Sequence, residues 1–358
     1  MSSTRRTTSR VLVGLAGATL IAAGLGATAA AQSPAAASPA AAGPIYTPLT
    51  AAPCDVSQKN IHFLSVLKPH PTLRLWQQGF LDQAAALGFK SATIASPDDA
   101  DWSKAVALGE GILATGTDGV VFGFVDPTEA DLIKKFGDAK IPVVIGHVEV
   151  PAGTYPGLLA WSGFDPAKWA VSAADAIGDK IGGTGAVAIT EGSFNVEEDA
   201  VAKAFAEEMA AKYPGVKVLA PQVEGFDVPA AIAVAVGILQ ANPAVVGAVS
   251  TTGAGPVTWS GAADETGRTV YSIGPDMTRP NLDAVKAGLV YALAAQPGYE
   301  EHQQAVDLLA KAICGQTIPY ANELPAPIVF ADGLAPYYKV VDEIDARTKS
   351  PTGASPSP

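Results

Sequence analysis

Residues 272–296 read SIGPDMTRPNLDAVKAGLVYALAAQ and contain one complete strand–helix–strand pattern. A short apolar run ends at Gly274, a helical segment ends at Gly288, and a second apolar run follows. Asp276 comes shortly after the first run, and Gln296 comes at the end of the second. Each of these polar residues is therefore expected at the end of a strand, either as an ordinary loop residue or as part of a site.

The same alternation of strands and helices extends over most of the chain. Apolar runs rich in β-forming residues predict strands at residues 61–66, 92–95, 119–122, 141–145, 158–161, 186–189, 216–219, 246–249 and 270–273, with helices between them. Short strands separated by helices are typical of parallel sheets covered on both faces. The series restarts near residues 161–165. The predicted fold class is therefore α/β, with two doubly wound parallel-sheet lobes joined by a hinge.

Composition sets the expected boundaries. We expect a signal peptide at residues 1–31, an Ala/Pro/Ser-rich linker at 32–55 and a flexible tail at 346–358. The N-terminal lobe is expected at 56–162, completed by about 297–322, and the C-terminal lobe at 163–296, completed by about 323–335. The linker composition predicts a flexible tether as far as about Pro53.

The first 31 residues predict export. Arg5, Arg6 and Arg10 precede an apolar run that ends in small residues before Gln32, as signal-peptidase sites do. A membrane anchor is the alternative, because the run is about long enough to span a bilayer. We expect an exported protein, periplasmic or otherwise extracytoplasmic, associated with the cell envelope.

The charge balance is acidic, with a formal net charge of −12 at pH 7. The content of 48% hydrophobic and 16% charged residues is that of a packed globular protein. The phosphates of a nucleic acid would be repelled overall, and no cluster of Lys and Arg lies beyond residue 10. The sequence therefore argues against nucleic acid as a partner.

Cys54 and Cys314 are the only cysteines. An even number in an exported chain favours a disulfide between the two ends of the fold, with two separate buried thiols as the alternative. The four histidines are too far apart in the sequence to suggest a metal site. The glycine-rich segment 182–185 precedes a strand instead of following one, so it is not a nucleotide-binding motif. No nucleophile motif stands out either, and we expect neither a cofactor nor an enzymatic activity.

Polar and aromatic side chains follow many of the predicted strands. The candidate ligand-binding residues are His70, Asp126, His147, Trp161, Asp199, Phe226, Thr252, Asp276 and Gln296. In doubly wound folds, ligands bind beyond the carboxyl ends of the strands. Carboxylates accept hydrogen bonds from vicinal hydroxyls, and rings cover C–H faces. The set therefore suits a neutral polyhydroxylated ligand.

Several of these residues also have a purely structural interpretation. Asp126 precedes a proline at a helix start and could cap that helix, a role compatible with ligand contact. His147 ends a buried strand and could be a hydrogen-bonded core residue. Trp161, at the lobe junction, could belong to the core or to the site. Phe226 could pack on the hinge.

Four segments point to a known family: Asp126-Pro127-Thr128, Ile141-Pro142-Val143-Val144, Gly163-Phe164-Asp165 and residues 272–296. With them the chain resembles the type I periplasmic sugar-binding proteins of ABC transporters, in particular their ribose-binding members, over about residues 60–330. The resemblance implies that Asp276 and Gln296 bind sugar hydroxyls. It also implies that Asp126 occupies a position that is often polar and that Phe226 is a ring stacking on the sugar.

The chain departs from this family at both arginine positions. His147-Val148 stands where the family has an Asp-Arg pair, and Glu197-Glu198-Asp199 stands where a second arginine is expected. Losing both arginines removes the bidentate grip on the oxygens of a pyranose ring. The expected ligand is therefore a smaller or acyclic polyol, or another small hydroxylated solute.

The resemblance implies a monomeric solute-binding protein that closes around a sugar or sugar alcohol. Such a protein delivers its ligand to the membrane permease of an ABC importer. A sensor that presents a small signal molecule to a membrane receptor is the alternative that fits the same features.

Overall fold

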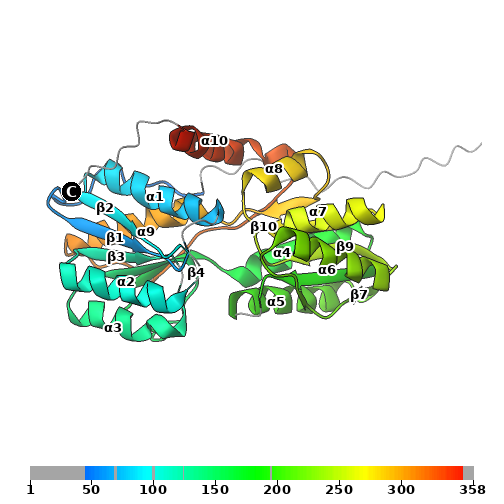
Figure 1. The fold of residues 1–358 in the computed structure, drawn as a ribbon, viewed down its shortest axis with the longest axis horizontal. Helices are drawn as coiled ribbons and strands as arrows, with labels where there is room; N and C mark the ends of the chain where they lie inside the picture. The colour runs from blue at the N-terminus through cyan, green and yellow to red at the C-terminus, as the bar shows by residue number, and fades with distance from the viewer. Residues whose placement is uncertain (1–44, 68–70, 99–100, 124, 194–195, 350–358) are drawn as a thin grey trace, which may run out of the picture. The chain divides into compact units, whose positions relative to one another are not determined.

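The computed structural model describes residues 45–67, 71–98, 101–123, 125–193 and 196–349. Within these ranges the chain forms two β-sheets, and helices flank both faces of each sheet (Figure 1). The predicted α/β class with parallel sheets is confirmed. In this part of the chain, no helix is long and apolar enough to cross a membrane.

The first sheet has the strand order β12–β5–β4–β3–β1–β2, and all neighbouring strands are parallel. Its strands are β1 (Asn60–Leu64), β2 (Ser91–Ala95), β3 (Gly119–Phe122), β4 (Val143–Val148), β5 (Ala160–Phe164) and β12 (Ala321–Glu323). One face is covered by α1 (Pro71–Leu87) and α9 (Gly298–Ile313), the other by α2 (Trp102–Thr115), the short helix η1 (Pro127–Glu129) and α3 (Ala130–Asp138). Because side chains alternate along a strand, Phe63 packs with the first group and Leu64 with the second.

The second sheet has the order β13–β11–β10–β9–β6–β7, with β8 also paired to β6. Its strands are β6 (Gly185–Glu191), β7 (Val216–Val218), β8 (Gln222–Val223), β9 (Val245–Ser250), β10 (Tyr271–Pro275), β11 (Ala292–Ala294) and β13 (Ile328–Val329). Only β13 is antiparallel to its neighbour among these strands. One face is covered by α4 (Pro166–Lys180) and α5 (Val196–Lys212), the other by α6 (Val228–Ala241) and α7 (Gly255–Thr266). The helix α8 (Arg279–Lys286) joins β10 to β11.

The described chain passes between the two sheets three times. It leaves the first sheet after β5, returns to it after β11, and leaves it again between β12 and β13. Gln296 lies in the second passage, between β11 and α9. The strand β5 runs across the expected lobe limit at residues 162–163, and the lobe limits themselves remain predictions.

The segment before β1 is fixed to the first sheet's helices, so the expectation of a flexible tether as far as about Pro53 is wrong for residues 45–53. The buried Asp307 of α9 accepts hydrogen bonds from the Tyr46 hydroxyl at 2.5 Å and from the Leu49 N–H at 2.8 Å. Cys54 and Cys314 form a disulfide with a Cα–Cα distance of 5.6 Å. The expected signal peptide and most of the expected linker lie outside the described residues.

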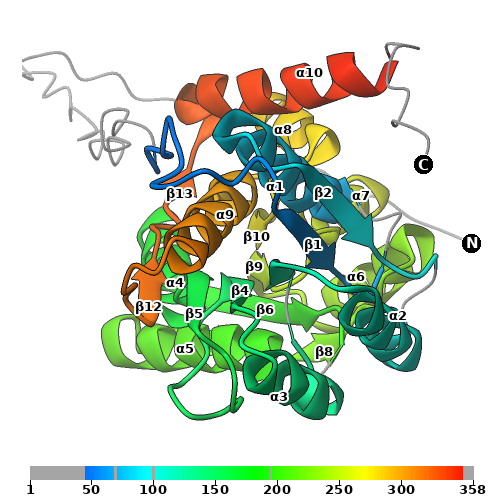
Figure 2. The same cartoon turned by 90° about the vertical axis from the view of Figure 1, so that its left-hand side faces the viewer.

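The C-terminal helix α10 (Ala335–Lys349), which follows the short helix η2 (Ala331–Gly333), contacts helices associated with both sheets. It lies beside α1 and α8 (Figure 2). Arg347 of α10 pairs with Asp82 of α1, and Asp342 of α10 pairs with Arg279 of α8. Residues 346–349 are thus helical, although the sequence placed them in a flexible tail.

We predict that Asp307→Ala destabilises the protein by about 3 kcal/mol, because three donors, from Tyr46, Leu49 and Gln83, lose a buried charged acceptor. Urea denaturation measures this change. Limited proteolysis of the folded variant should also cut the segment at residues 45–53 faster than in the wild type. Asp264→Ala, at an exposed position of α7, is the matched control. Equal urea midpoints for both variants would contradict the role of Asp307.

Candidate functional site

The site begins with two strand ends, one in each sheet. His147 is the second-to-last residue of β4, and Asp276 directly follows β10. Among the described residues, three non-glycine residues have a positive φ, and two of them are His147 at 85° and Asp276 at 72°. This backbone region costs free energy for a residue with a Cβ and persists only when surrounding contacts hold it. Both side chains are therefore held in position by their neighbours.

His147 contacts elements of both sheets. Its Nδ1 lies 3.0 Å from Oε1 of Glu301 in the first turn of α9, and its Nε2 lies 3.5 Å from Oε1 of Glu197 in the first turn of α5. The ring centroid of Trp76 lies 4.2 Å from the imidazole, and that of Phe164 lies 5.1 Å away. The buried imidazole thus joins a carboxylate on each side.

The two carboxylates decide the charge of this histidine. Burial lowers the pKa of His147, but Glu301 and Glu197 outweigh burial and raise it to about 10. Burial raises the pKa of Glu301, and His147 opposes that change. Nδ1 of the neighbouring His302 lies 2.8 Å from the Gly298 carbonyl and 3.5 Å from Oε1 of Glu301, and burial lowers the pKa of His302 to about 3. At neutral pH His147 is therefore an imidazolium and His302 is uncharged.

Asp276 contacts the first sheet's helix α1. Its Oδ2 accepts a hydrogen bond of 2.5 Å from the Thr72 hydroxyl. Asn281 fixes the loop that carries Asp276, because its Nδ2 donates to the carbonyls of Gly253 at 2.8 Å and Asp276 at 3.0 Å. A Cβ on Gly253 would lie only 2.0 Å from Oδ2 of Asp276. A glycine is therefore required there for the carboxylate to take this position.

A second group of polar side chains surrounds the start of α5. Oε2 of Glu198 accepts hydrogen bonds from the Gly192 N–H at 2.6 Å and from the Thr251 hydroxyl at 2.5 Å. Phe226 is 64% exposed, and its ring lies against Gly192, where a Cβ would be 2.4 Å from the ring. Thr252 is buried beside the same glycine. The ends of β6 and β9 and the loop before α6 therefore meet here.

Gln296 lies at the end of β11, the parallel neighbour of β10. It is half-buried, its backbone N–H donates to the Ala294 carbonyl at 2.9 Å, and its own carbonyl accepts from Gly298 at 2.9 Å. These backbone bonds form the turn that leads into α9, the helix that carries Glu301. The structure thus places Gln296 at the same sheet edge as Asp276.

Other sequence candidates lie elsewhere or have a second role. Asp126 caps η1 in a capping box with Glu129, so the structural interpretation of Asp126 applies. Trp161 is only 3% exposed and belongs to the core between the first sheet and α2–α3, and it is not among the residues that meet at the strand ends. Asp199 is exposed on the first turn of α5. His70 lies outside the described residues.

The candidate residues drawn from the sequence do not include Thr72, Trp76, Glu197 or Glu301, although Glu197 stands where the resemblance implies an arginine. Thr72 and Trp76 lie in the first turns of α1, and Glu197 and Glu301 lie in the first turns of α5 and α9. Helices that follow parallel strands start at the edge where ligands bind. First-turn polar residues of these helices were therefore the available signal, beside the strand ends themselves.

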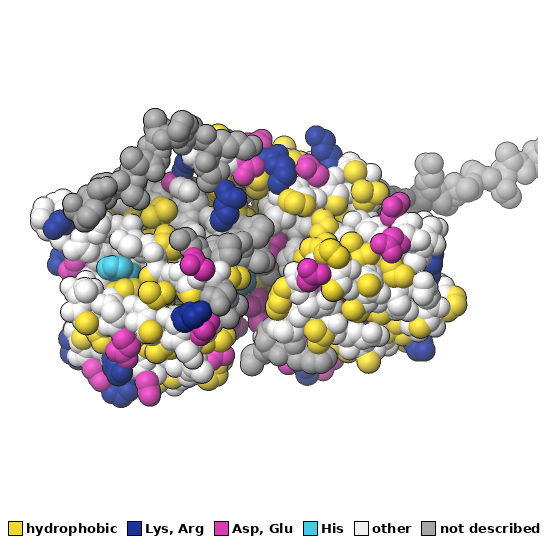
Figure 3. Space-filling model, viewed as in Figure 1, with side chains coloured by type: hydrophobic (Ala, Val, Ile, Leu, Met, Phe, Trp, Pro, Cys, Tyr) yellow, Lys and Arg dark blue, Asp and Glu magenta, His cyan; other side chains and the backbone are white. Residues whose placement is uncertain are grey.

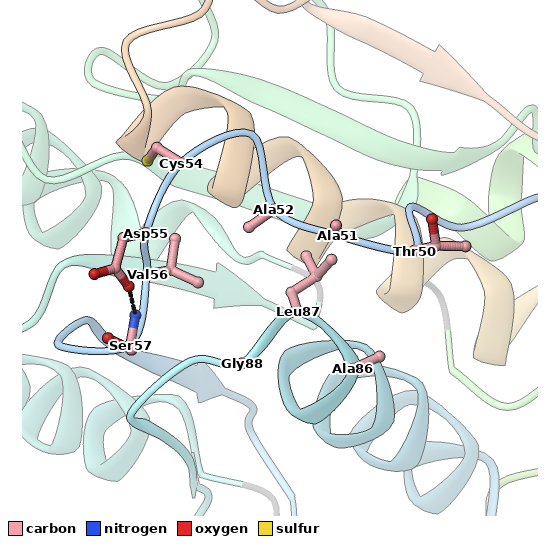
Figure 4. Close-up of a pocket in the computed structure, with 10 residues that line it drawn as sticks. All are labelled: Thr50, Ala51, Ala52, Cys54, Asp55, Val56, Ser57, Ala86, Leu87 and Gly88. Atoms are coloured by element: carbon pink, nitrogen blue, oxygen red, sulfur yellow. Dashed lines mark hydrogen bonds between the residues drawn. The ribbon is translucent and has the colours of Figure 1, made fainter.

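A hollow of about 330 Å³ lies away from this group (Figure 4). It is lined by the segment from Thr50 to Ser57 and by the end of α1 at Leu87 and Gly88. Thr72 lies at the opposite end of α1, which at about 1.5 Å per residue is roughly 25 Å long. This hollow is therefore not part of the strand-end site.

The described residues contain no group of three or more His, Cys, Asp and Glu side chains arranged to hold a metal ion. On the face of the molecule in Figure 3, Lys and Arg side chains are scattered among Asp and Glu. That face does not present the continuous basic surface that binding to a nucleic-acid backbone requires.

Two doubly wound sheets, with contacts between the strand ends of each sheet and the helix starts beside the other, are the architecture of a two-lobed α/β binding protein. A family model described as a periplasmic binding protein domain matches residues 61–317, and the chain belongs to this family. A comparison with curated protein sequences found no match.

Solved structures with the same fold include a glucose-galactose binding protein from Geobacillus stearothermophilus, at 20% identity and a TM-score of 0.71, covering 78% of this chain and 99% of that one. A Burkholderia graminis solute-binding protein in complex with D-arabinose has 20% identity, a TM-score of 0.73 and coverages of 79% and 98%. A Bacillus halodurans solute-binding protein with bound myo-inositol has 18% identity, a TM-score of 0.71 and coverages of 80% and 99%.

We predict that Gly253→Ala destabilises the protein by about 1–3 kcal/mol, because the added methyl group collides with the Asp276 carboxylate. Thermal unfolding measures the effect. Gly237→Ala is the matched control, since nothing lies within 4 Å of the added Cβ in α6, and there it should stabilise by up to about 1 kcal/mol. Similar melting temperatures for both variants would rule out the close approach of Gly253 to Asp276.

Proposed function

We propose that this chain is the extracytoplasmic solute-binding protein of an ABC importer, and that it binds a small polyhydroxylated ligand, a sugar or a sugar alcohol. One observation carries the proposal. At the strand ends, donors associated with the first sheet meet carboxylates associated with the second, as Thr72 does with Asp276 and His147 with Glu197. Family membership and the sugar and inositol complexes among the similar structures support the same class of ligand.

The chemistry of the group fits hydroxyl recognition. A hydroxyl is both a donor and an acceptor, so it can donate to Asp276 or Glu197 while it accepts from His147. Trp76 and Phe226 add aromatic surface beside these polar groups. Hydrogen bonds to charged groups are stronger than those between neutral groups, so a few ligand hydroxyls suffice for firm binding.

Ligand binding works through hinge closure in this proposal. The three passages between the sheets form the hinge, and the closed form is selected because only there do the ligand hydroxyls reach both sets of side chains. No bond of the ligand is broken. The closed protein then docks on a membrane permease, which receives the ligand.

The absence of the two arginines narrows the ligand class. The sequence has His147 and Glu197 at positions where the related sugar-binding proteins carry arginines or their partners. A single imidazolium offers fewer donors than an arginine and lacks its planar fork. A small or acyclic polyol therefore fits better than a pyranose held through its ring oxygen.

The proposed cellular setting is extracytoplasmic. The N-terminal segment directs export, and the protein works as a monomer outside the cytoplasm, associated with the cell envelope through its permease. The Cys54–Cys314 disulfide suits an oxidising compartment.

We predict that Asp276→Asn weakens ligand binding by about tenfold or more, because a charged acceptor of a ligand hydroxyl becomes neutral. A thermal-shift screen of D-glucose, D-arabinose, myo-inositol and sorbitol first identifies the ligands that stabilise the wild type. Calorimetry with the best of them then compares the variants. Asp264→Asn, an exposed change of the same kind, should bind as the wild type does. Unchanged affinity in Asp276→Asn would contradict the assignment of Asp276.

A further inference from the structure

Glu301 contacts His147, and neither the family match nor the sequence assigns a role to this contact. Glu301 is fully buried in the first turn of α9, and its Oε1 lies 3.0 Å from Nδ1 of His147. The other ring nitrogen of His147 points toward Glu197 of α5, at 3.5 Å. The His147 ring therefore lies between two carboxylates. That of Glu301 is buried, and that of Glu197 belongs to a side chain that is 29% exposed.

We propose that Glu301 is a positioning residue that keeps His147 as an imidazolium, with its Nε2–H directed at Glu197 across the strand-end site. This inference rests on the proposed function, because the Nε2–H is the donor offered to a ligand hydroxyl. The 3.5 Å separation from Glu197 is longer than a good hydrogen bond, so a ligand oxygen can compete for this donor.

The packing around His147 fixes the direction of the ring. The ring of Trp76 in α1 packs against it at an interplanar angle of 39°, and Phe164 lies edge-on from β5. The positive φ of His147 turns its side chain away from the course of a regular strand, which is a strain that the Glu301 contact compensates. Orientation and charge thus come from the same contact.

The charged and titratable groups that face His147 among the described residues are Glu301 and His302 from α9 and Glu197 from α5. His302 is buried and neutral, and its ring stacks on Trp76 with centroids 5.1 Å apart. Nδ1 of His302 lies nearer to the Gly298 carbonyl, at 2.8 Å, than to Oε1 of Glu301, at 3.5 Å, and this buried histidine is uncharged.

His147 and Glu301 also give the site a cationic donor in the absence of the arginines that the resemblance leads us to expect. An arginine keeps its charge at any physiological pH, whereas a buried histidine does so only beside a carboxylate. The carboxylate beside His147 is that of Glu301, in the helix that follows Gln296. His147 and Glu301 together thus supply one fixed cationic donor.

Imidazole nitrogen NMR tests the inference directly and needs no ligand. The full chain is titrated from pH 5 to pH 10, with the His147 signals assigned by comparison with His147→Gln. We expect His147 to stay protonated through pH 8 in the wild type. In Glu301→Gln its titration midpoint should fall by about 1–3 pH units, as expected on removal of an adjacent opposite charge. Glu300→Gln, the neighbouring position on α9, is the matched control and should leave the midpoint unchanged.

Two results would overturn the inference. One is a wild-type His147 that is already neutral at pH 7, an outcome that decides the matter even if Glu301→Gln does not fold. The other is a midpoint in Glu301→Gln equal to that of the wild type. Glu197→Gln measures how much the second carboxylate raises the pKa of His147. The His147 midpoint should fall less in this variant than in Glu301→Gln.

A binding measurement connects the charge to the site. With D-arabinose and myo-inositol as probes, wild-type affinity should be constant between pH 6 and pH 8. In Glu301→Gln it should fall, by up to about tenfold for each pH unit above the new midpoint. An affinity in Glu301→Gln that does not change with pH across that variant's own NMR midpoint would overturn the inference and leave the proposed function standing. Binding of neither probe by the wild type would count against the proposed ligand class, and the NMR titration would still decide the role of Glu301.

Discussion

A buried imidazolium must lie beside a carboxylate, and the arrangement of the strand ends depends on this requirement. Removing a charge from water costs several kcal/mol unless a partner repays it, as a rough general magnitude. Glu301 is that partner for His147, and it brings the start of α9 against the end of β4. Gly146 allows this approach, because a Cβ there would lie 2.4 Å from Nε2 of His302. The charge of His147, the packing of α9 and the absence of a side chain at residue 146 therefore depend on one another.

In the second sheet, the buried charged group at a strand end is a carboxylate instead of a cation. Asp276 has a positive φ as His147 does, and it too needs a neighbour without a Cβ, Gly253. Asn281 holds the loop through the backbone and leaves the carboxylate oxygens to other donors, of which Thr72 is one. Each sheet thus carries one strained, buried polar residue at a strand end, supported from behind by a buried polar side chain. Such preorganisation lowers the entropy that a ligand must overcome on binding.

The fold could be predicted from the sequence because apolar strands and amphipathic helices repeat with clear periods, and 272–296 shows this in one unit. Asp276 and Gln296 could be placed at a sheet edge for the same reason. Glu301 and Thr72 could not, because a first-turn polar residue of a helix has the same sequence pattern whether it faces solvent or another strand end. Trp161 has two interpretations in the sequence, core or site, and the structure adds that its ring packs in the core.

The parts that flank the family match add contacts of a different kind. The family model covers residues 61–317, while the segment before β1 and the helix α10 lie outside it. The first is tied by a disulfide and by the buried Asp307 to a single sheet's helices, so it can move with that sheet as one body. In contrast, α10 is tied to α1 by Arg347 and to α8 by Asp342, and these helices belong to different sheets. Any change in the angle between the sheets must therefore break or rearrange exposed ion pairs of α10. Such pairs contribute only about 0–1 kcal/mol each, but Val341 of α10 also packs in an apolar cluster with Leu282 of α8 and Leu75 of α1, so hinge motion must rearrange this packing too, whereas the N-terminal attachment is not affected by it.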